Sequence, residues 1–220
     1  MMKVDKVVRS RRRTISIEVR RDASLVVRAP YTVSSSVIER FLHEKRGWIS
    51  RKQGLARERV RVEKQFVDGE EFLYLGRSYK LSIVENGQQP ISFDGRFLLS
   101  REHAVEGRRR FIEWYRGEAR RLLPERVERF AAAAGLSYQC VRITSALTRW
   151  GSCGVKGSLN FSWRLMMLPP HIIDSIVVHE VAHLDVRNHS QRFWRRVEDI
   201  FPDYRECDRW LRENDHRLSL

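Results

Sequence analysis

A short histidine-rich stretch constrains this chain more than any other part of its sequence. Positions 179 to 189 read His-Glu-Val-Ala-His-Leu-Asp-Val-Arg-Asn-His, so three of the seven histidines lie within eleven residues. In a helix His179 and His183 share one face, because residues four apart lie one above the other. Glu180 lies one step round, where it can face a water molecule bound to a metal held by the two imidazoles. The spacing therefore predicts a helix that carries the core of a zinc hydrolase.

Two simpler explanations of this stretch are weak. A chance match to the His, Glu and His spacing is expected in roughly 1–2 of a hundred such chains, and a further histidine at a fixed offset lowers this roughly thirtyfold. A single histidine is more often a hydrogen-bonded core residue than a metal ligand. Here, however, Ile173, Val177 and Val181 form an apolar stripe that continues to Leu184. This stripe turns the histidine face away from the main core and favours metal binding.

A catalytic zinc site normally has three protein ligands and leaves the fourth position to water. The candidates for the third ligand are His189, Glu198, Asp199 and Glu206. His189 has the spacing used by metzincins, although Val186 replaces their glycine and no methionine follows for a Met-turn. Asn188 tolerates a left-handed conformation and can make the turn instead. We expect His189 to be the third ligand, with Glu198, in a thermolysin-like arrangement, second.

Hydrophobic periodicity predicts an α+β protein with a domain boundary near residue 100. Residues 1–100 are expected to form an N-terminal β-rich domain with one helix, in which a hairpin turns at Asp94-Gly95. Its expected strands are Thr14–Val19, Ser24–Arg28, Glu71–Leu75, Tyr79–Val84 and the two arms of Ile91–Leu99, and its expected helix spans Val37–Ile49.

Residues 101–220 are expected to form the second domain, with a small sheet and several helices. A long helix over Ala104–Ala134 should end at Gly135 and kink or split at Pro124. The other expected elements are strands at Cys140–Thr144 and Ser158–Trp163, the metal-binding helix Pro170–Arg187, a helix Gln191–Phe201 capped by Ser190, and a last helix after Pro202.

Composition limits the setting in which the chain works. It has no apolar run of eighteen residues and no signal-peptide pattern, so we expect a cytoplasmic protein without a membrane partner. Cys140, Cys153 and Cys207 are odd in number and widely spaced, which indicates a reducing compartment rather than a disulfide framework. The formal net charge of +14 is compatible with a nucleic-acid or nucleotide partner. Because the arginines are dispersed, solvated surface is the favoured explanation.

Several segments resemble the YgjP-like metallopeptidases, which are related to SprT-like zincins and minigluzincins. The matching segments are Arg149–Cys153, Leu159–Leu165 with Leu168-Pro169, Val178–Leu184, Asn188–Ser190, Phe193-Trp194 and Pro202–Tyr204, with a weaker likeness at Val26–Pro30 and Phe41–Ile49. The resemblance implies a zincin-like catalytic domain with a backing helix, a small sheet, the HExxH helix and C-terminal helices. It also implies a histidine as third ligand, which the sequence offers as His189.

The leading hypothesis is a zinc-dependent metallopeptidase with one Zn²⁺ ion bound by His179, His183 and His189. Glu180 would act as general base and take a proton from the metal-bound water, which would then attack the peptide carbonyl and cleave the bond. Substrate contacts are assigned to Asn160 and Tyr204. Asn160 is on the strand 158–163, which could accept an extended peptide if it lies at the sheet edge; an ordinary packed strand is the equally favoured alternative. The oxyanion could be stabilised by Tyr204, Arg187 or His171. Ser152 and Cys153 are interpreted as part of a tight glycine turn rather than as nucleophiles.

Two alternatives stay open at the level of sequence. The same zinc-activated water could hydrolyse a nucleotide phosphoanhydride, although no glycine-rich phosphate-binding loop precedes a helix here. Alternatively, a fourth ligand such as Cys153 could close a structural zinc site in a non-catalytic protein that binds nucleic acid.

Overall fold

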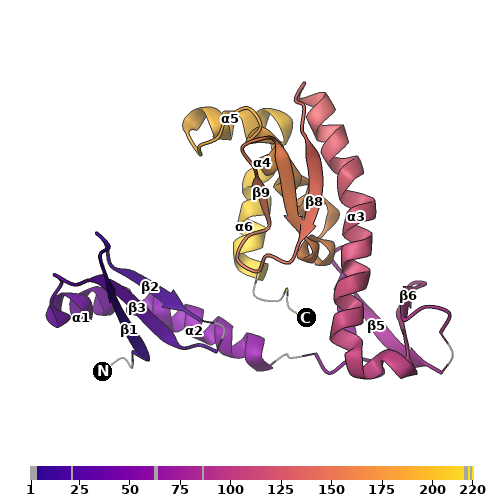
Figure 1. The fold of residues 1–220 in the computed structure, drawn as a ribbon, viewed down its shortest axis with the longest axis horizontal. Helices are drawn as coiled ribbons and strands as arrows, with labels where there is room; N and C mark the ends of the chain where they lie inside the picture. The colour runs from indigo at the N-terminus through magenta and orange to yellow at the C-terminus, as the bar shows by residue number, and fades with distance from the viewer. Residues whose placement is uncertain (1–3, 21, 62–63, 86, 216–217, 219) are drawn as a thin grey trace. The chain divides into compact units, whose positions relative to one another are not determined.

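A computed structural model describes residues 4–20, 22–61, 64–85, 87–215, 218 and 220, with the backbone alone for residues 57–61. Contacts between residues divide the chain into two compact units. The first, which we call the N-terminal unit, spans residues 1–63, and the second, which we call the C-terminal unit, holds residues 64–218 and Leu220 (Figure 1).

The N-terminal unit is a three-stranded sheet covered on one face by two helices. Strands β1 (Lys6–Ser10), β2 (Ser16–Val19) and β3 (Leu25–Pro30) lie in the order β1-β3-β2, with β1 parallel and β2 antiparallel to β3. Alternate residues of β3 point to one face, so Leu25, Val27 and Ala29 pack together against the helices. The helices are α1 (Ser35–Glu44) and α2 (Arg46–Arg61), which contribute Ile38, Leu42 and Ile49 to this core.

Part of this unit differs from the sequence prediction. The strands expected at 14–19 and 24–28 are present as β2 and β3, whereas β1 was not predicted. The single helix expected over 37–49 is two helices separated by Lys45. Hydrogen bonds of helical spacing continue on both sides of this residue, from Lys45 N to Phe41 O and from Ile49 N to Lys45 O. The helical spacing of the apolar residues therefore continues across Lys45, and it does not predict that the helix is interrupted there.

The C-terminal unit begins with a four-stranded sheet. Strands β4 (Glu71–Tyr74), β5 (Arg77–Val84), β6 (Ile91–Phe93) and β7 (Phe97–Ser100) lie in the order β4-β5-β7-β6. The hairpin expected at 91–99 is present as β6 and β7, but three residues rather than two separate the paired Phe93 and Phe97. Gly95 in this turn has a φ of 101°, a conformation that glycine adopts without steric cost. A short 3₁₀ helix, Arg101–Glu106, follows β7.

The long helix α3 (Gly107–Ala133) runs through Pro124 without being split, contrary to one of the two expected outcomes. Its buried residues recur at every fourth position: Gly107, Phe111, Tyr115, Ala119, Leu123, Val127 and Ala131. Four residues turn a helix by about 40° more than one full turn, so this stripe winds around α3. One helix can thereby pack on β6 and also on strand β8 (Cys140–Thr144) and helix α4 (Pro170–Ala182). The expected cap is confirmed, since Gly135 has a φ of 67°.

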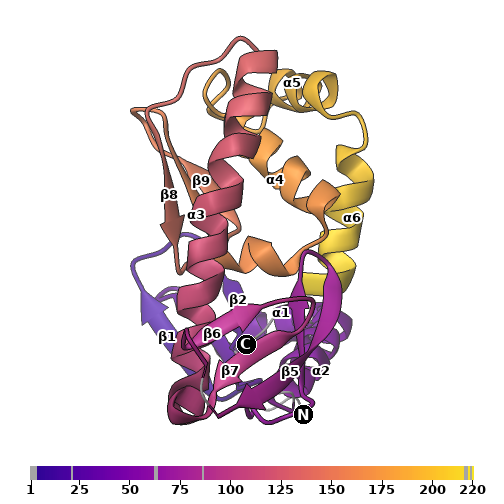
Figure 2. The same ribbon diagram turned by 90° about the vertical axis from the view of Figure 1, so that its right-hand side faces the viewer.

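A second, three-stranded sheet and three helices complete the unit. Strands β8 (Cys140–Thr144), β9 (Gly151–Cys153) and β10 (Ser158–Ser162) lie in the order β8-β10-β9, with β10 parallel to β8 and antiparallel to β9. The residues 163–167 form a 3₁₀ helix before α4 (Pro170–Ala182), α5 (Gln191–Ile200) and α6 (Tyr204–Asn214). α4 contacts α3, α5, α6 and β9 (Figure 2). Within the described part of the chain, no helix is long and apolar enough to cross a membrane.

The division by contacts falls at residue 63 rather than near residue 100, where the sequence analysis expected a domain boundary. The reason is aromatic packing between the first sheet of the C-terminal unit and α3. Phe72 stacks on Phe111 with ring centroids 4.1 Å apart, and Phe97 contacts both Phe111 and Tyr115. These rings join strands that precede residue 100 to the helix that follows it in one hydrophobic core.

The winding stripe on α3 generates a prediction about two adjacent leucines. Leu123 is fully buried, whereas Leu122 is only partly buried at the edge of the same core. We expect Leu123→Ala to lower the free energy of unfolding by about 2–5 kcal/mol because it leaves a cavity in a closely packed core. Leu122→Ala serves as the matched control and should cost less. Urea denaturation of both variants measures this difference, and equal losses would contradict the assignment of the buried stripe.

Candidate metal centre and active site

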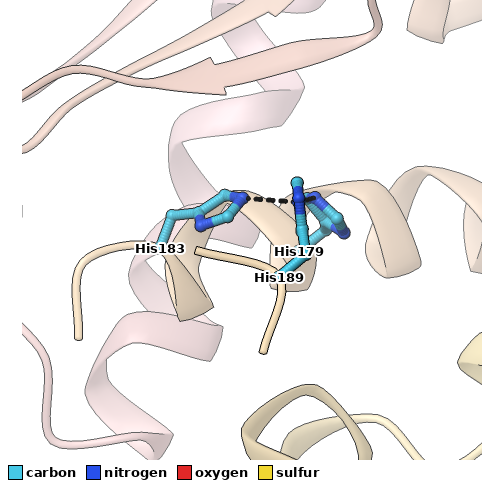
Figure 3. Close-up of side chains that lie close together, drawn as sticks. All are labelled: His179, His183 and His189. Atoms are coloured by element: carbon cyan, nitrogen blue, oxygen red, sulfur yellow. Dashed lines mark hydrogen bonds between the residues drawn. The ribbon is translucent and has the colours of Figure 1, made fainter. Parts of the chain in front are cut away.

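The end of α4 places the first two histidines of the site. Ile173, Val177 and Val181 are fully buried, as the apolar stripe predicted. The helix was expected to reach Arg187 but ends at Ala182, with His183 as its C-terminal cap. The N–H of Val186 still bonds to Ala182 O, so the chain turns tightly at this point. This early end lets the following loop bring His189 back toward His179 and His183 (Figure 3).

The three imidazoles point their Nε2 atoms at one another. His189 Nε2 lies 3.1 Å from His183 Nε2 and 3.1 Å from His179 Nε2. Two nitrogens bound tetrahedrally to one zinc ion at 2.0–2.1 Å are separated by about 3.3 Å, so the observed spacing matches shared ligation. A single Nε2 carries either one hydrogen or one in-plane lone pair, and it cannot satisfy two such neighbours by hydrogen bonding. A cation between the three nitrogens would satisfy them all.

Protonation and hydrogen bonding prepare these rings to act as ligands. His183 Nδ1 lies 2.9 Å from the carbonyl oxygen of Val186, to which it donates, so its Nε2 keeps a free lone pair in the neutral ring. Burial, followed by the neighbouring His183 and His189, lowers the pKa of His179 to about 4. Burial also lowers the pKa of His183. Neutral imidazole is the form that binds a metal ion.

The ring of Phe193, on α5, packs against the rings of all three histidines. Its ring centroid lies 4.9 Å from His179, 4.4 Å from His183 and 4.9 Å from His189, and the side chain is fully buried. Trp194 stacks on His189 at 5.7 Å and on Tyr204 at 5.5 Å. The two aromatic residues restrict the rotation of the imidazoles and cover them with apolar surface where they are in contact. Sequence reasoning gave them no functional role, because their contacts depend on how α5 packs against α4.

Glu180 lies on the buried side of α4 beside strand β9. Its exposed fraction is 6%, and burial raises the pKa of its carboxyl to about 7 although the charge of Arg149 opposes the rise. A Cβ atom at Gly151 would lie 2.7 Å from Glu180 Oε1, so a side chain at this position would require the Glu180 side chain to move. The sequence analysis interpreted residues 150–153 as a turn, whereas 151–153 form the edge strand β9.

Three other residues that the sequence analysis assigned to the site lie outside the group of three histidines. Asn160 is on the central strand β10, so of the two open possibilities, an edge strand or a packed strand, the structure shows the packed strand. Its Nδ2 donates to Ser152 O at 3.2 Å. Tyr204 is buried in the stack behind His189 and Trp194. His171, proposed for the oxyanion, lies eight residues before His179 on α4, which is about 12 Å along the helix.

Arg187, also proposed for the oxyanion, holds the loop that follows β9. Its guanidinium donates to Gly154 O at 2.8 Å and to Val155 O at 3.1 Å, and it lies 3.2 Å from Cys153 Sγ. These bonds tie the loop after α4 to the loop after the edge strand. Arg187 therefore holds the loop after α4 and the loop after β9 next to each other.

The alternative metal ligands do not join the histidines. In the described part of the chain, the one group of three or more potential ligands is His179, His183 and His189. Glu198, the second choice for third ligand, lies 3.6 Å from Arg205 as an exposed ion pair. Asp199 and Glu206, also considered, are exposed, and Cys153 contacts Arg187 instead.

The raised pKa of Glu180 predicts how stability depends on pH in the metal-free protein. A carboxyl whose folded pKa is about 7, against an ordinary 4.5, stabilises the fold below about pH 4.5, and this contribution is lost as the pH rises through 7. Glu180→Gln should therefore gain about 3 kcal/mol in unfolding free energy relative to the parent between about pH 4.5 and pH 8. Urea denaturation with a chelator present measures the difference, and a constant gap across this pH range would contradict it.

Of three comparisons with known proteins, the match to a protein-family model agrees with the geometry of the site. The family model described as "YgjP-like, metallopeptidase domain" matches residues 13–214. A search of the curated proteins found no match. A solved structure, described as the metallopeptidase zymogen of Pyrococcus abyssi abylysin, is 26% identical and matches with a TM-score of 0.39, over 42% of this chain and 94% of that chain.

Proposed function

The chain belongs to the YgjP-like metallopeptidase family, and we propose that it is a zinc-dependent peptidase whose metal is bound by His179, His183 and His189. The observation that supports this assignment best is the convergence of three Nε2 atoms, with His189 Nε2 3.1 Å from each of the other two. The family supports the peptidase activity, and the ligand set supports the identity of the metal.

Zinc is the metal that fits this donor set. Three neutral imidazoles are borderline donors that suit Zn²⁺, whereas Mg²⁺ and Ca²⁺ prefer oxygen ligands. Three protein ligands also leave one tetrahedral position open, as a catalytic site requires. Among the described residues no fourth ligand belongs to the group, so the arrangement favours a catalytic site over a closed structural one.

Glu180 is proposed as the general base. When bound, Zn²⁺ would lower the pKa of water and polarise the scissile carbonyl group. In the metal-free protein burial raises the pKa of the Glu180 carboxyl to about 7. Beside the metal, its carboxylate would accept a proton from the attacking water and pass it to the leaving amine. Burial thus gives Glu180 a proton affinity that an exposed glutamate lacks.

The edge strand β9 is the proposed binding place for an extended peptide. β9 pairs with β10 along one side, and in the described residues its other side has no strand partner. A substrate could add there by main-chain hydrogen bonds, with its scissile bond near Glu180, because a Cβ atom at Gly151 of β9 would lie 2.7 Å from Glu180 Oε1. Asn160, through its bond to Ser152, and Tyr204, through the stack on Trp194, would support β9 and His189 from behind.

The role of His189 as a metal ligand can be tested with His171, an exposed histidine on α4, as the control. We expect His189→Ala to lose most of its zinc, because two imidazoles bind far more weakly than three, whereas the exposed His171→Ala should keep one equivalent. Elemental analysis after dialysis against limiting zinc measures both. Cys153→Ser should also keep the metal, and loss of zinc in that variant would instead support the closed structural site.

Parallel assays with two substrates separate peptidase from phosphoanhydride chemistry. We expect the zinc-loaded protein to cleave unfolded casein and to leave nucleoside triphosphates intact. Glu180→Gln should retain zinc but slow casein cleavage by about 100- to 10,000-fold, since proton transfer is lost. Triphosphate hydrolysis that disappears in Glu180→Gln would identify a nucleotide hydrolase, and unchanged casein cleavage in this variant would remove Glu180 from the proposed role.

A further inference from the structure

The positive charge of the protein is concentrated in the N-terminal unit. Residues 1–63 contain 17 of the 42 lysine and arginine residues but only 7 of the 28 aspartate and glutamate residues. Residues 64–220 contain the remaining 25 and 21, so the smaller unit carries +10 of the formal net charge of +14. The basic residues are dispersed along the whole chain, but 21 of the 28 acidic residues lie in residues 64–220.

The two units also differ in how their charges are compensated. In the C-terminal unit many basic residues have acidic partners: Arg109 and Arg110 pair with Glu106 and Glu113, and Asp174 pairs with Arg126 and Arg129. In the part of the N-terminal unit that the structure describes, the ion pair is Arg28 with Glu18.

Two acids of the N-terminal unit accept main-chain hydrogen bonds. Asp5 accepts from Leu25 N, and Asp22 accepts from Ser24 N. The excess of basic over acidic residues in residues 1–63, 17 against 7, leaves this unit with a strongly positive net charge.

One flank of α1 and α2 combines cations with an exposed aromatic ring. Arg51 and Lys52 follow Trp48 by three and four residues in α2, so they lie on the same flank of this helix. Lys45 lies three residues before Trp48, between α1 and α2, where hydrogen bonds of helical spacing continue. The three basic residues are exposed, and Trp48 is 37% exposed although its neighbour Ile49 is fully buried in the core. We call Lys45, Trp48, Arg51 and Lys52 the α2 basic patch.

We propose that the α2 basic patch binds single-stranded nucleic acid. Lysine and arginine neutralise backbone phosphates, and an exposed indole offers a surface on which an unpaired base can stack. A duplex keeps its bases stacked on one another and gains less from such a ring. An anionic membrane would require a broad apolar face, whereas Trp48 is the large apolar side chain among the exposed residues at 46–54 of α2. The proposal does not depend on the metal site or on the peptidase assignment.

The test measures binding of the full-length protein to a fluorescein-labelled oligo-dT of about 20 nucleotides by fluorescence polarisation. Binding should weaken steeply between about 50 and 200 mM salt. The triple variant Lys45→Gln, Arg51→Gln, Lys52→Gln should bind at least about tenfold more weakly, and its log-log salt slope should fall by about two. Trp48→Ala should weaken binding about tenfold, and Trp48→Phe should restore most of it because the ring is retained.

The matched control removes the same charge from the other unit. Arg108, Arg120 and Arg142 are exposed residues of the C-terminal unit, and changing all three to glutamine should leave oligonucleotide affinity within about twofold. Circular dichroism and thermal unfolding establish that each variant is folded. Equal losses in the two triple variants, tighter binding to a duplex of the same length, or binding to phosphatidylserine vesicles without binding to oligo-dT would each overturn the proposal.

Discussion

Mutual proximity of three ring nitrogens is the constraint on which the site depends. His183 Nε2 and His179 Nε2 each lie 3.1 Å from His189 Nε2, a contact set that hydrogen bonds among neutral imidazoles cannot satisfy. The chain maintains this arrangement through packing: the Val186 carbonyl orients one ring, and the fully buried Phe193 touches all three. The protein thus preorganises the ligands, and the burial that orients His179 also lowers its pKa and keeps it neutral.

The early end of α4 is what allows a third histidine to join the first two. Had the helix continued to residue 187, as its sequence suggested, His189 would have been carried away along the helix axis. Instead the chain turns after Ala182, and α5 packs against α4 with Phe193 and Val197 in a shared core with Val178. The loop after α4, His189 and the aromatic ring of Phe193 are therefore parts of one local structure.

Local patterns in the sequence predicted much of the fold and the centre of the site. The positions of His179, Glu180 and His183 follow from helical periodicity alone, and strands such as 140–144 were visible in their β-branched residues. The order of strands was not predictable, because it depends on long-range pairing. That is why the sequence left open whether the strand of Asn160 lies at the edge or in the middle of the sheet, and β9 occupies the edge. The contact between Phe193 and the imidazoles likewise arises only when two helices pack together.

Gly151 connects the two tasks of the proposed active site. A Cβ atom at Gly151, in the strand proposed to bind the substrate, would lie 2.7 Å from Oε1 of Glu180, the residue proposed to accept the proton of the attacking water. A larger side chain at this position, introduced to improve the grip on a peptide, would displace the proton acceptor. Selectivity in this enzyme must therefore be changed elsewhere along the strand, and the residue closest to the chemistry has little freedom to vary.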